Sequence, residues 1–125
     1  MKIDFLKKRA ENFLTTANYH FQKEMYPLAA FDLGQACQLY LKYYLFLKLR
    51  RYPKTHSLRE LLQGIGKVYK KQKAIDKIIK ENVNIIADLE EAYITSRYLP
   101  AEFFKEQVKN MKKFTRDLIK FLKKL

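Results

Sequence analysis

LAAFDLGQACQLYLKYYLFLKL, at residues 28–49, is long, free of proline and apolar on nearly all sides. Pro27 precedes it, where the first turn of a helix tolerates proline, and Gly34 is its only glycine. Residues 27–49 are therefore predicted to form a helix about 34 Å long. Because such a helix needs cover on most sides, we expect it at the centre of the molecule. Its polar minority consists of Asp32, Gln35, Gln38 and Lys42.

Four further segments repeat apolar residues at intervals of three and four, the period of an amphipathic helix. They cover residues 3–25, 57–68, 75–98 and 102–125. Segment 75–98 is predicted as one continuous helix whose apolar stripe includes Val83, and Pro100 ends it. The predicted fold class is all-α, an antiparallel up-and-down bundle of four main helices plus one shorter helix. We expect one domain over residues 1–125.

The segment RRYPKTHS at residues 50–57 is predicted to be a loop, because Pro53 disfavours helix at the residue before it. Ser57 followed by Glu60 fits a capping box, so the next helix is expected to begin there.

Composition excludes several classes of protein. Three glycines and three prolines are too few for the many turns of a β-sandwich or barrel. The single cysteine, Cys37, excludes an internal disulfide and a thiolate-clustered metal site, and we interpret it as a core residue. The two histidines, His20 and His56, form no HExxH, and no phosphate-binding GxxxxGK[ST] is present. We expect no metal, no cofactor and no membrane span, in a cytoplasmic protein.

The chain carries 26 Lys and Arg against 13 Asp and Glu, a formal charge of +13. Six cations recur at steps of three and four near the carboxyl end and form one ridge of a helix: Lys105, Lys109, Lys112, Arg116, Lys120 and Lys123. We favour a solvated helix face for this ridge. The alternative is a surface for non-specific binding of nucleic acid.

Three segments, at residues 29–47, 53–62 and 89–100, together resemble the HEPN domain family. That family shows A-x-F-x-x-Q-Q-A-x-x-x-x-L-K-A, then T-H-x-L-x-x-L, then Y-x-x-x-R-Y-P. The matching residues are Ala29, Phe31, Gln35, Ala36, Leu41 and Lys42, then Thr55, His56, Leu58 and Leu61, then Tyr93, Arg97 and Tyr98. Two departures are Gly34, in place of the first Gln, and Leu99, which separates Tyr98 from Pro100.

The resemblance implies a homodimer, frequently encoded beside a small nucleotidyltransferase as a toxin–antitoxin pair. Ribonuclease members carry R-x(4-6)-H near the start of the last helix, but Glu102, Phe103 and Phe104 occupy the places where that histidine would follow Arg97. Arg51 and His56 also match R-x4-H, in a loop that is the wrong context, and are weak catalytic candidates. We therefore expect a non-catalytic or degenerate member, with a metal-independent ribonuclease toxin as the alternative.

Two sets of residues are predicted to carry the function. Arg51, Lys54, His56 and Arg97, with Tyr93 one helical turn before Arg97, are expected to bind a nucleotide or its phosphate. A purely structural role for His56 and Arg97 stays open beside this. The apolar excess of segment 27–49 predicts a dimer interface. Its residues are Phe31, Leu39, Tyr43, Phe46 and Leu49.

Overall fold

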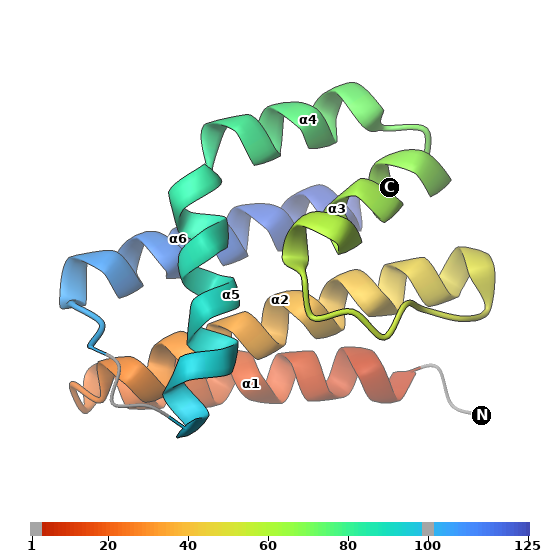
Figure 1. The fold of residues 1–125 in the computed structure, drawn as a ribbon. Helices are drawn as coiled ribbons and strands as arrows, with labels where there is room; N and C mark the ends of the chain where they lie inside the picture. Colours follow the sequence, from red (N-terminus) through yellow and green to blue (C-terminus); the bar gives the residue numbers. More distant parts are fainter. Residues whose placement is uncertain (1–3, 99–101) are drawn as a thin grey trace.

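The computed structural model describes residues 4–98 and 102–125, and for residues 94–98 it describes the backbone alone. Six helices make up the described part of the chain (Figure 1). They are α1 (Asp4–Gln22), α2 (Tyr26–Leu49), α3 (Leu58–Val68), α4 (Gln72–Glu81), α5 (Val83–Tyr98) and α6 (Lys105–Lys123). The all-helical class that the sequence predicts is confirmed.

α1 and α2 form a tight antiparallel hairpin, and they lie side by side along their length in Figure 1. α1 stops because Glu24 adopts a left-handed conformation, with φ at 61°. The amide of Met25 then donates to the carbonyl of His20 at 2.8 Å, which satisfies one of the open carbonyls at the helix end. Pro27 stands in the first turn of α2 and starts the return helix.

α2 is the central helix, as its composition predicts. It contacts α1, α3, α5 and α6, so it is covered on most of its sides. The residues of α2 that are buried include Leu33, Cys37, Leu41 and Leu45. Cys37 Sγ lies 3.3 Å from the Thr115 hydroxyl of α6, and burial raises the pKa of its thiol to about 12. The interpretation of Cys37 as a core residue is thereby confirmed.

The prediction of one helix over residues 75–98 is wrong, because α4 ends at Glu81 and α5 begins at Val83. At the break, the Asn82 side chain donates to the carbonyl of Ile78 at 2.8 Å and so replaces a backbone partner. Val83, placed in the apolar stripe from the sequence, is 60% exposed. The apolar period continues on both sides of Asn82. The sequence pattern therefore does not predict that the chain changes direction between α4 and α5.

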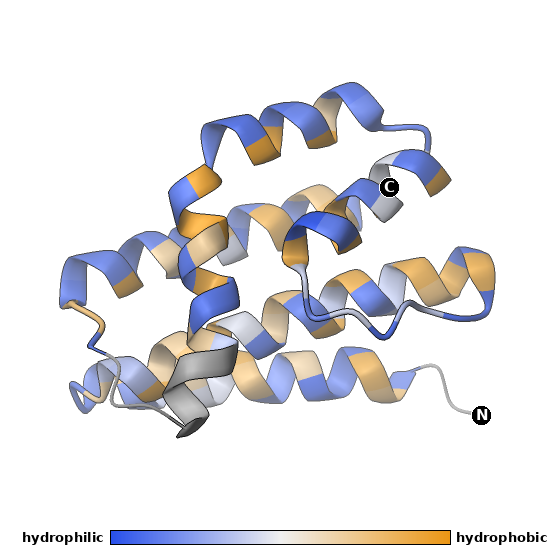
Figure 2. Ribbon diagram, viewed as in Figure 1, coloured by the Kyte–Doolittle hydropathy of each residue, from blue (hydrophilic) through white to orange (hydrophobic). Residues whose placement is uncertain are grey.

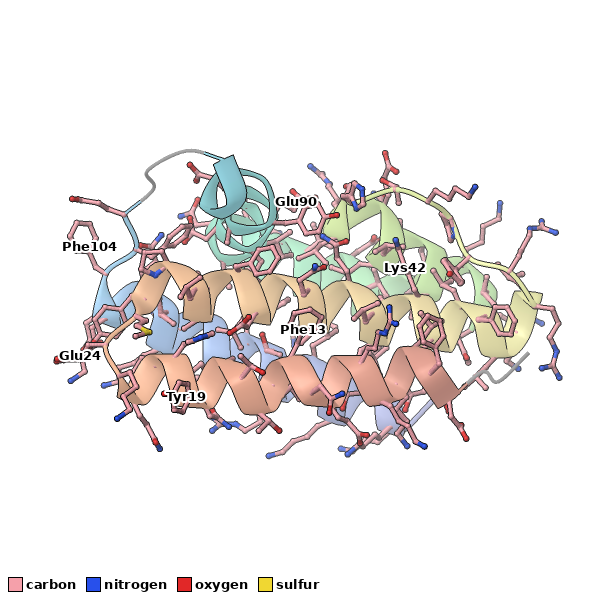
Figure 3. All side chains as sticks on the ribbon, turned by 90° about the horizontal axis from the view of Figure 1, so that it is seen from below. Phe13, Tyr19, Glu24, Lys42, Glu90 and Phe104 are labelled. Carbon is pink, nitrogen blue, oxygen red and sulfur yellow. The ribbon has the colours of Figure 1, made fainter. Side chains whose placement is uncertain are left out.

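α5 crosses α2 steeply: it runs transverse to α2 in Figure 1 and is seen nearly end-on in Figure 3. The count of four main helices plus one, all antiparallel, is therefore not confirmed. Gly34 allows the crossing, because a Cβ on it would lie only 2.8 Å from the carbonyl oxygen of Leu89.

α4 shows how the outer helices divide between core and solvent. Figure 2 shows hydrophilic residues along its outer side and hydrophobic residues on the side turned toward the rest of the molecule. Ile75 is fully buried, while Ile78 and Ile79 are half-buried against the core. Among the described residues, no helix is both long and apolar enough to span a membrane.

Candidate functional site

The loop at residues 50–57 reverses direction at the end of α2 and runs back along that helix. α2 ends where Arg50 turns left-handed, with its amide donating to the carbonyl of Phe46 at 2.9 Å. The ring of Tyr52 lies 6.1 Å from that of Phe46, while His56 contacts Gln38. Phe46 and Gln38 are eight residues apart on a helix, so the loop retraces about 12 Å of α2.

Gln38 fixes His56 from inside the helix. Its side chain is 2% exposed, and its Nε2 donates to the carbonyl of His56 at 3.2 Å. Its Oε1 lies 3.4 Å from Nδ1 of the imidazole and is left to accept from an Nδ1–H. This assigns the neutral ring the Nδ1–H tautomer and leaves Nε2 as an acceptor, 3.5 Å from the hydroxyl of Tyr93.

The imidazole of His56 ends a column of four rings that we call the His56–Tyr93 stack. His56 stacks on Tyr93 of α5 with centroids 4.5 Å apart and the planes 26° from parallel. Tyr93 stacks on Phe31 of α2 at 6.3 Å, and Phe31 meets Phe13 of α1 edge to face at 6.3 Å. The column thus connects three helices to the loop, and His56 at its outer end is exposed.

Backbone capping fixes the loop on the other side of His56. The Thr55 hydroxyl accepts from the amide of Ser57 at 3.1 Å. The Ser57 hydroxyl accepts from the amide of Glu60 at 3.2 Å, which confirms Ser57 as the cap of α3. His56 is therefore held between the α3 cap and Gln38, so its ring has little freedom to leave Tyr93.

The cations predicted to bind phosphate lie at different places along the loop and α5. Arg51 and Lys54 are exposed on the loop. Arg97 stands one helical turn after Tyr93 in α5, and its side chain lies outside the described residues. Arg51 is next to Tyr52, which lies against Phe46, whereas His56 contacts Gln38 further back along α2. The R-x4-H match of Arg51 and His56 stays a weak catalytic prediction.

Four of the five residues expected at a dimer interface are half-buried by contacts within the chain, and the interface itself stays a prediction. Phe31 belongs to the His56–Tyr93 stack, Phe46 packs on Tyr52, and Tyr43 meets Tyr44 edge to face at 5.2 Å. Leu39 is half-buried against the core. Leu49 is 39% exposed, and Leu47 and Phe5 are each 38% exposed. These three lie at the same end of the antiparallel hairpin.

One polar contact between α1 and α2 is not predicted from the sequence. Nδ1 of His20 lies 2.6 Å from a carboxylate oxygen of the buried Asp32, which links α1 to α2. Burial raises the pKa of Asp32, and the hydrogen bond and charge of His20 oppose that rise. A carboxylate inside an otherwise apolar helix needs a partner, and that requirement is the signal that could have paired Asp32 with His20. Among the described residues, no three His, Cys, Asp or Glu side chains gather as a metal site.

Three of the four rings of the stack, Phe31, His56 and Tyr93, come from the three segments that carry the family pattern, 29–47, 53–62 and 89–100. The all-helical fold of the described residues, with these segments brought together, is consistent with a HEPN-like domain. A sequence model described as the HEPN domain matches residues 3–125, and the chain belongs to the HEPN domain family. HEPN domains are generally related to nucleotides or RNA. No curated protein and no solved structure gave a match.

Proposed function

We propose that this protein is a non-catalytic HEPN module that binds a nucleotide at the His56–Tyr93 stack. The observation that carries the proposal is the His56 ring, stacked at 4.5 Å on Tyr93, held by the buried Gln38 and exposed at the end of the column. A nucleobase would add one more ring to this column, since bases stack on aromatic side chains whatever their sequence.

The phosphate of such a nucleotide would be bound by the neighbouring cations. Arg97 follows Tyr93 by one turn of α5, and a guanidinium offers a planar fork of donors suited to phosphate. Lys54 lies two residues before His56 on the same loop, and Arg51 stands further along it. In this proposal Arg97 and Lys54 contact phosphate directly, while Arg51 contributes to the positive field.

Two features of the chain support binding without catalysis. Glu102, Phe103 and Phe104 stand where the histidine of ribonuclease members would follow Arg97. Tyr52, the neighbour of Arg51, lies against Phe46, whereas His56 contacts Gln38 about 12 Å further back along α2, so Arg51 and His56 stand toward opposite ends of the loop. Incubation of the purified protein with total RNA in chelator is expected to leave the RNA intact. Cleavage that persists after repeated purification would make the protein a metal-independent ribonuclease instead.

The proposal includes a homodimer and a small nucleotidyltransferase partner, in a toxin–antitoxin-like system. Leu49, with Leu47 and Phe5 at the same end of the hairpin, supports an interface between copies there. Light scattering at micromolar concentration is expected to give twice 15.1 kDa. A clean monomer would remove the dimer from the proposal. Co-purification with a nucleotidyltransferase encoded beside it tests the second partner.

Calorimetric titration with mononucleotides tests the binding site. Arg97→Ala is expected to weaken nucleotide binding at least tenfold, about 1.4 kcal/mol, with a small change in melting temperature. His56→Ala is expected to weaken binding as much and also to lower the melting temperature, because it removes the stack on Tyr93 and one contact of Gln38. Arg59→Ala, which removes an exposed arginine of α3, is the matched control and is expected to bind like wild type. If both site variants bind like the control but melt at lower temperature, these residues belong to the scaffold and the proposal fails.

A further inference from the structure

A second surface, distinct from the His56–Tyr93 stack, is a hollow of about 460 Å³ between α1 and α6, which we call the α1–α6 groove. Its floor comes from Leu33 of α2 with Thr115 and Ile119 of α6, all of them buried. Leu14 and Asn18 line it from α1. The remaining lining residues are the cations Lys112, Arg116, Lys120 and Lys123 of α6.

These four cations form a regular row. They follow one another at intervals of four, four and three residues, so they occupy one side of α6 over about 16 Å. Successive members are about 4.5–6 Å apart along the axis, a spacing comparable to the step between neighbouring phosphates of an extended strand. Three of them, Arg116, Lys120 and Lys123, are exposed, and Lys112 is half-buried.

The charge of this row is not neutralised by the protein. No carboxylate lines the α1–α6 groove, and among the described residues none of the four cations forms an ion pair. α6 has two acidic residues, and both are elsewhere. Glu106 pairs with Lys109 at 3.6 Å, while Asp117 lines a different hollow beside Phe114 and Phe121. The carboxylates of α6 therefore lie away from the α1–α6 groove, and every charged side chain that lines the groove is positive.

The row continues beyond the groove. A neighbouring hollow of about 480 Å³ shares Lys112 and Arg116 with it and adds Lys109 and Lys113. Its lining also contains Glu106, the partner of Lys109. A polyanion that follows α6 would therefore meet six cations and one carboxylate, which favours a long ligand over a single phosphate.

The nature of the floor decides between classes of ligand. Leu33, Thr115 and Ile119 are already buried, so an amphipathic helix from another protein would cover little additional apolar surface. Phe21, the one ring lining either hollow, lies under the ammonium of Lys112 at 4.3 Å. The groove thus offers charge without a free stacking platform and without polar groups arranged to recognise bases.

We infer that the α1–α6 groove binds the phosphodiester backbone of a single nucleic-acid strand, without reading its sequence. Figure 3 shows α5 and the 50–57 loop on one side of α2 and α1 on the other, so the groove and the His56–Tyr93 stack face different sides of the central helix. Strand binding in the groove is therefore independent of the nucleotide site proposed above.

Fluorescence anisotropy with labelled 12-residue oligonucleotides tests this inference. The groove variant combines Arg116→Gln, Lys120→Gln and Lys123→Gln. The control variant combines Lys73→Gln, Lys77→Gln and Lys80→Gln, which removes the same charge from exposed positions of α4. The groove variant is expected to bind at least tenfold more weakly than the control, and its salt dependence, d log K/d log [salt], to fall in magnitude by about 2.

Four ligands distinguish the chemistry: an RNA strand, a DNA strand of the same sequence, an abasic strand of the same length, and polyglutamate of equal charge. RNA, DNA and the abasic strand are expected to bind within about threefold of one another, because phosphates carry the interaction. A tenfold loss with the abasic strand, or polyglutamate binding as tightly as RNA, would overturn the inference. So would equal affinity of the groove and control variants. Mononucleotide binding by the groove variant is expected to equal that of wild type, which keeps this test separate from that of the His56–Tyr93 stack.

Discussion

Gln38 of α2 holds His56 at two points, its carbonyl at 3.2 Å and its imidazole Nδ1 at 3.4 Å. A buried amide on the central helix therefore positions the ring at the tip of an aromatic column, seven residues after the last residue of that helix, Leu49. The orientation of His56 depends on this amide as well as on its stacking with Tyr93.

Replacing Gln38 by methionine tests that dependence. Gln38→Met keeps the length of the side chain and removes both contacts, so the unfolding free energy is expected to fall by about 1–2 kcal/mol. Nucleotide affinity is expected to drop about fivefold, because the ring is no longer oriented. Calorimetry and thermal melting measure the two effects. Gln63→Met, at an exposed position of α3, is expected to change neither. Unchanged affinity for Gln38→Met would show that stacking alone orients His56.

Gly34→Ala is expected to disturb the crossing of α5 over α2. The new Cβ would lie 2.8 Å from the backbone oxygen of Leu89, so α5 must move, at a cost of about 1–3 kcal/mol. Gly64→Ala is the matched control, since its Cβ would meet a movable methyl of Leu45 at 3.3 Å. Both variants gain the same helix propensity, so the difference in their melting temperatures measures the clash. Equal melting temperatures would mean that the crossing tolerates a methyl group.

The buried Lys42 predicts a dependence of stability on pH. Burial lowers the pKa of its ammonium below the ordinary 10.5. The unfolded chain therefore binds this proton more readily than the folded chain does. The contribution of Lys42 to the unfolding free energy is complete above pH 10.5, and it is lost as the pH falls through the folded pKa. Lys42→Met is expected to be more stable than wild type at pH 7, by a margin that narrows toward pH 10.5 in chemical denaturation. Lys77→Met, at an exposed position of α4, is the control, and its difference in unfolding free energy from wild type is expected not to change with pH. A difference for Lys42→Met that stays constant with pH would contradict the lowered pKa of Lys42.

Lys70 offers a stabilising substitution. It follows α3 in a left-handed conformation with φ at 57°, which glycine adopts without steric cost. Lys70→Gly is expected to raise the unfolding free energy by up to about 1 kcal/mol. Lys67→Gly, at an exposed site within α3, is expected to lower it by about 1 kcal/mol. A loss of stability in both variants would show that the Lys70 side chain makes a compensating contact.

The sequence was sufficient to predict the central helix, because α2 is apolar on nearly every side and no other arrangement covers it. It also predicted the cap at Ser57, whose partner Glu60 is only three residues away. It failed at Asn82, where two amphipathic helices meet without an interruption in the apolar period. Local patterns describe which face of a helix is buried, and they contain no information on the angle at which the next helix crosses it.

For the site, the family pattern identified His56 and Tyr93, and the structure stacks them. Gln38 and Phe31 were not predicted to join them, because their contacts depend on the path of the loop and on the crossing of α5. Leu39, Tyr43, Phe46 and Leu49 show the converse difficulty. Their apolar character predicts a surface for another chain. Contacts within the chain half-bury Leu39, Tyr43 and Phe46, while Leu49 is 39% exposed, and no periodicity distinguishes burial within a chain from burial between chains, so the interface stays a prediction.

The length of the loop that runs back along α2 determines where His56 lies on that helix. Each residue of extended chain advances about 3.3 Å, whereas one turn of the helix beneath it rises 5.4 Å. Inserting or deleting one residue between Tyr52 and Thr55 would therefore carry the imidazole more than half a turn away from Gln38 and out of register with Tyr93. Loop length in this protein is therefore as much a determinant of the site as the identity of the residues in it.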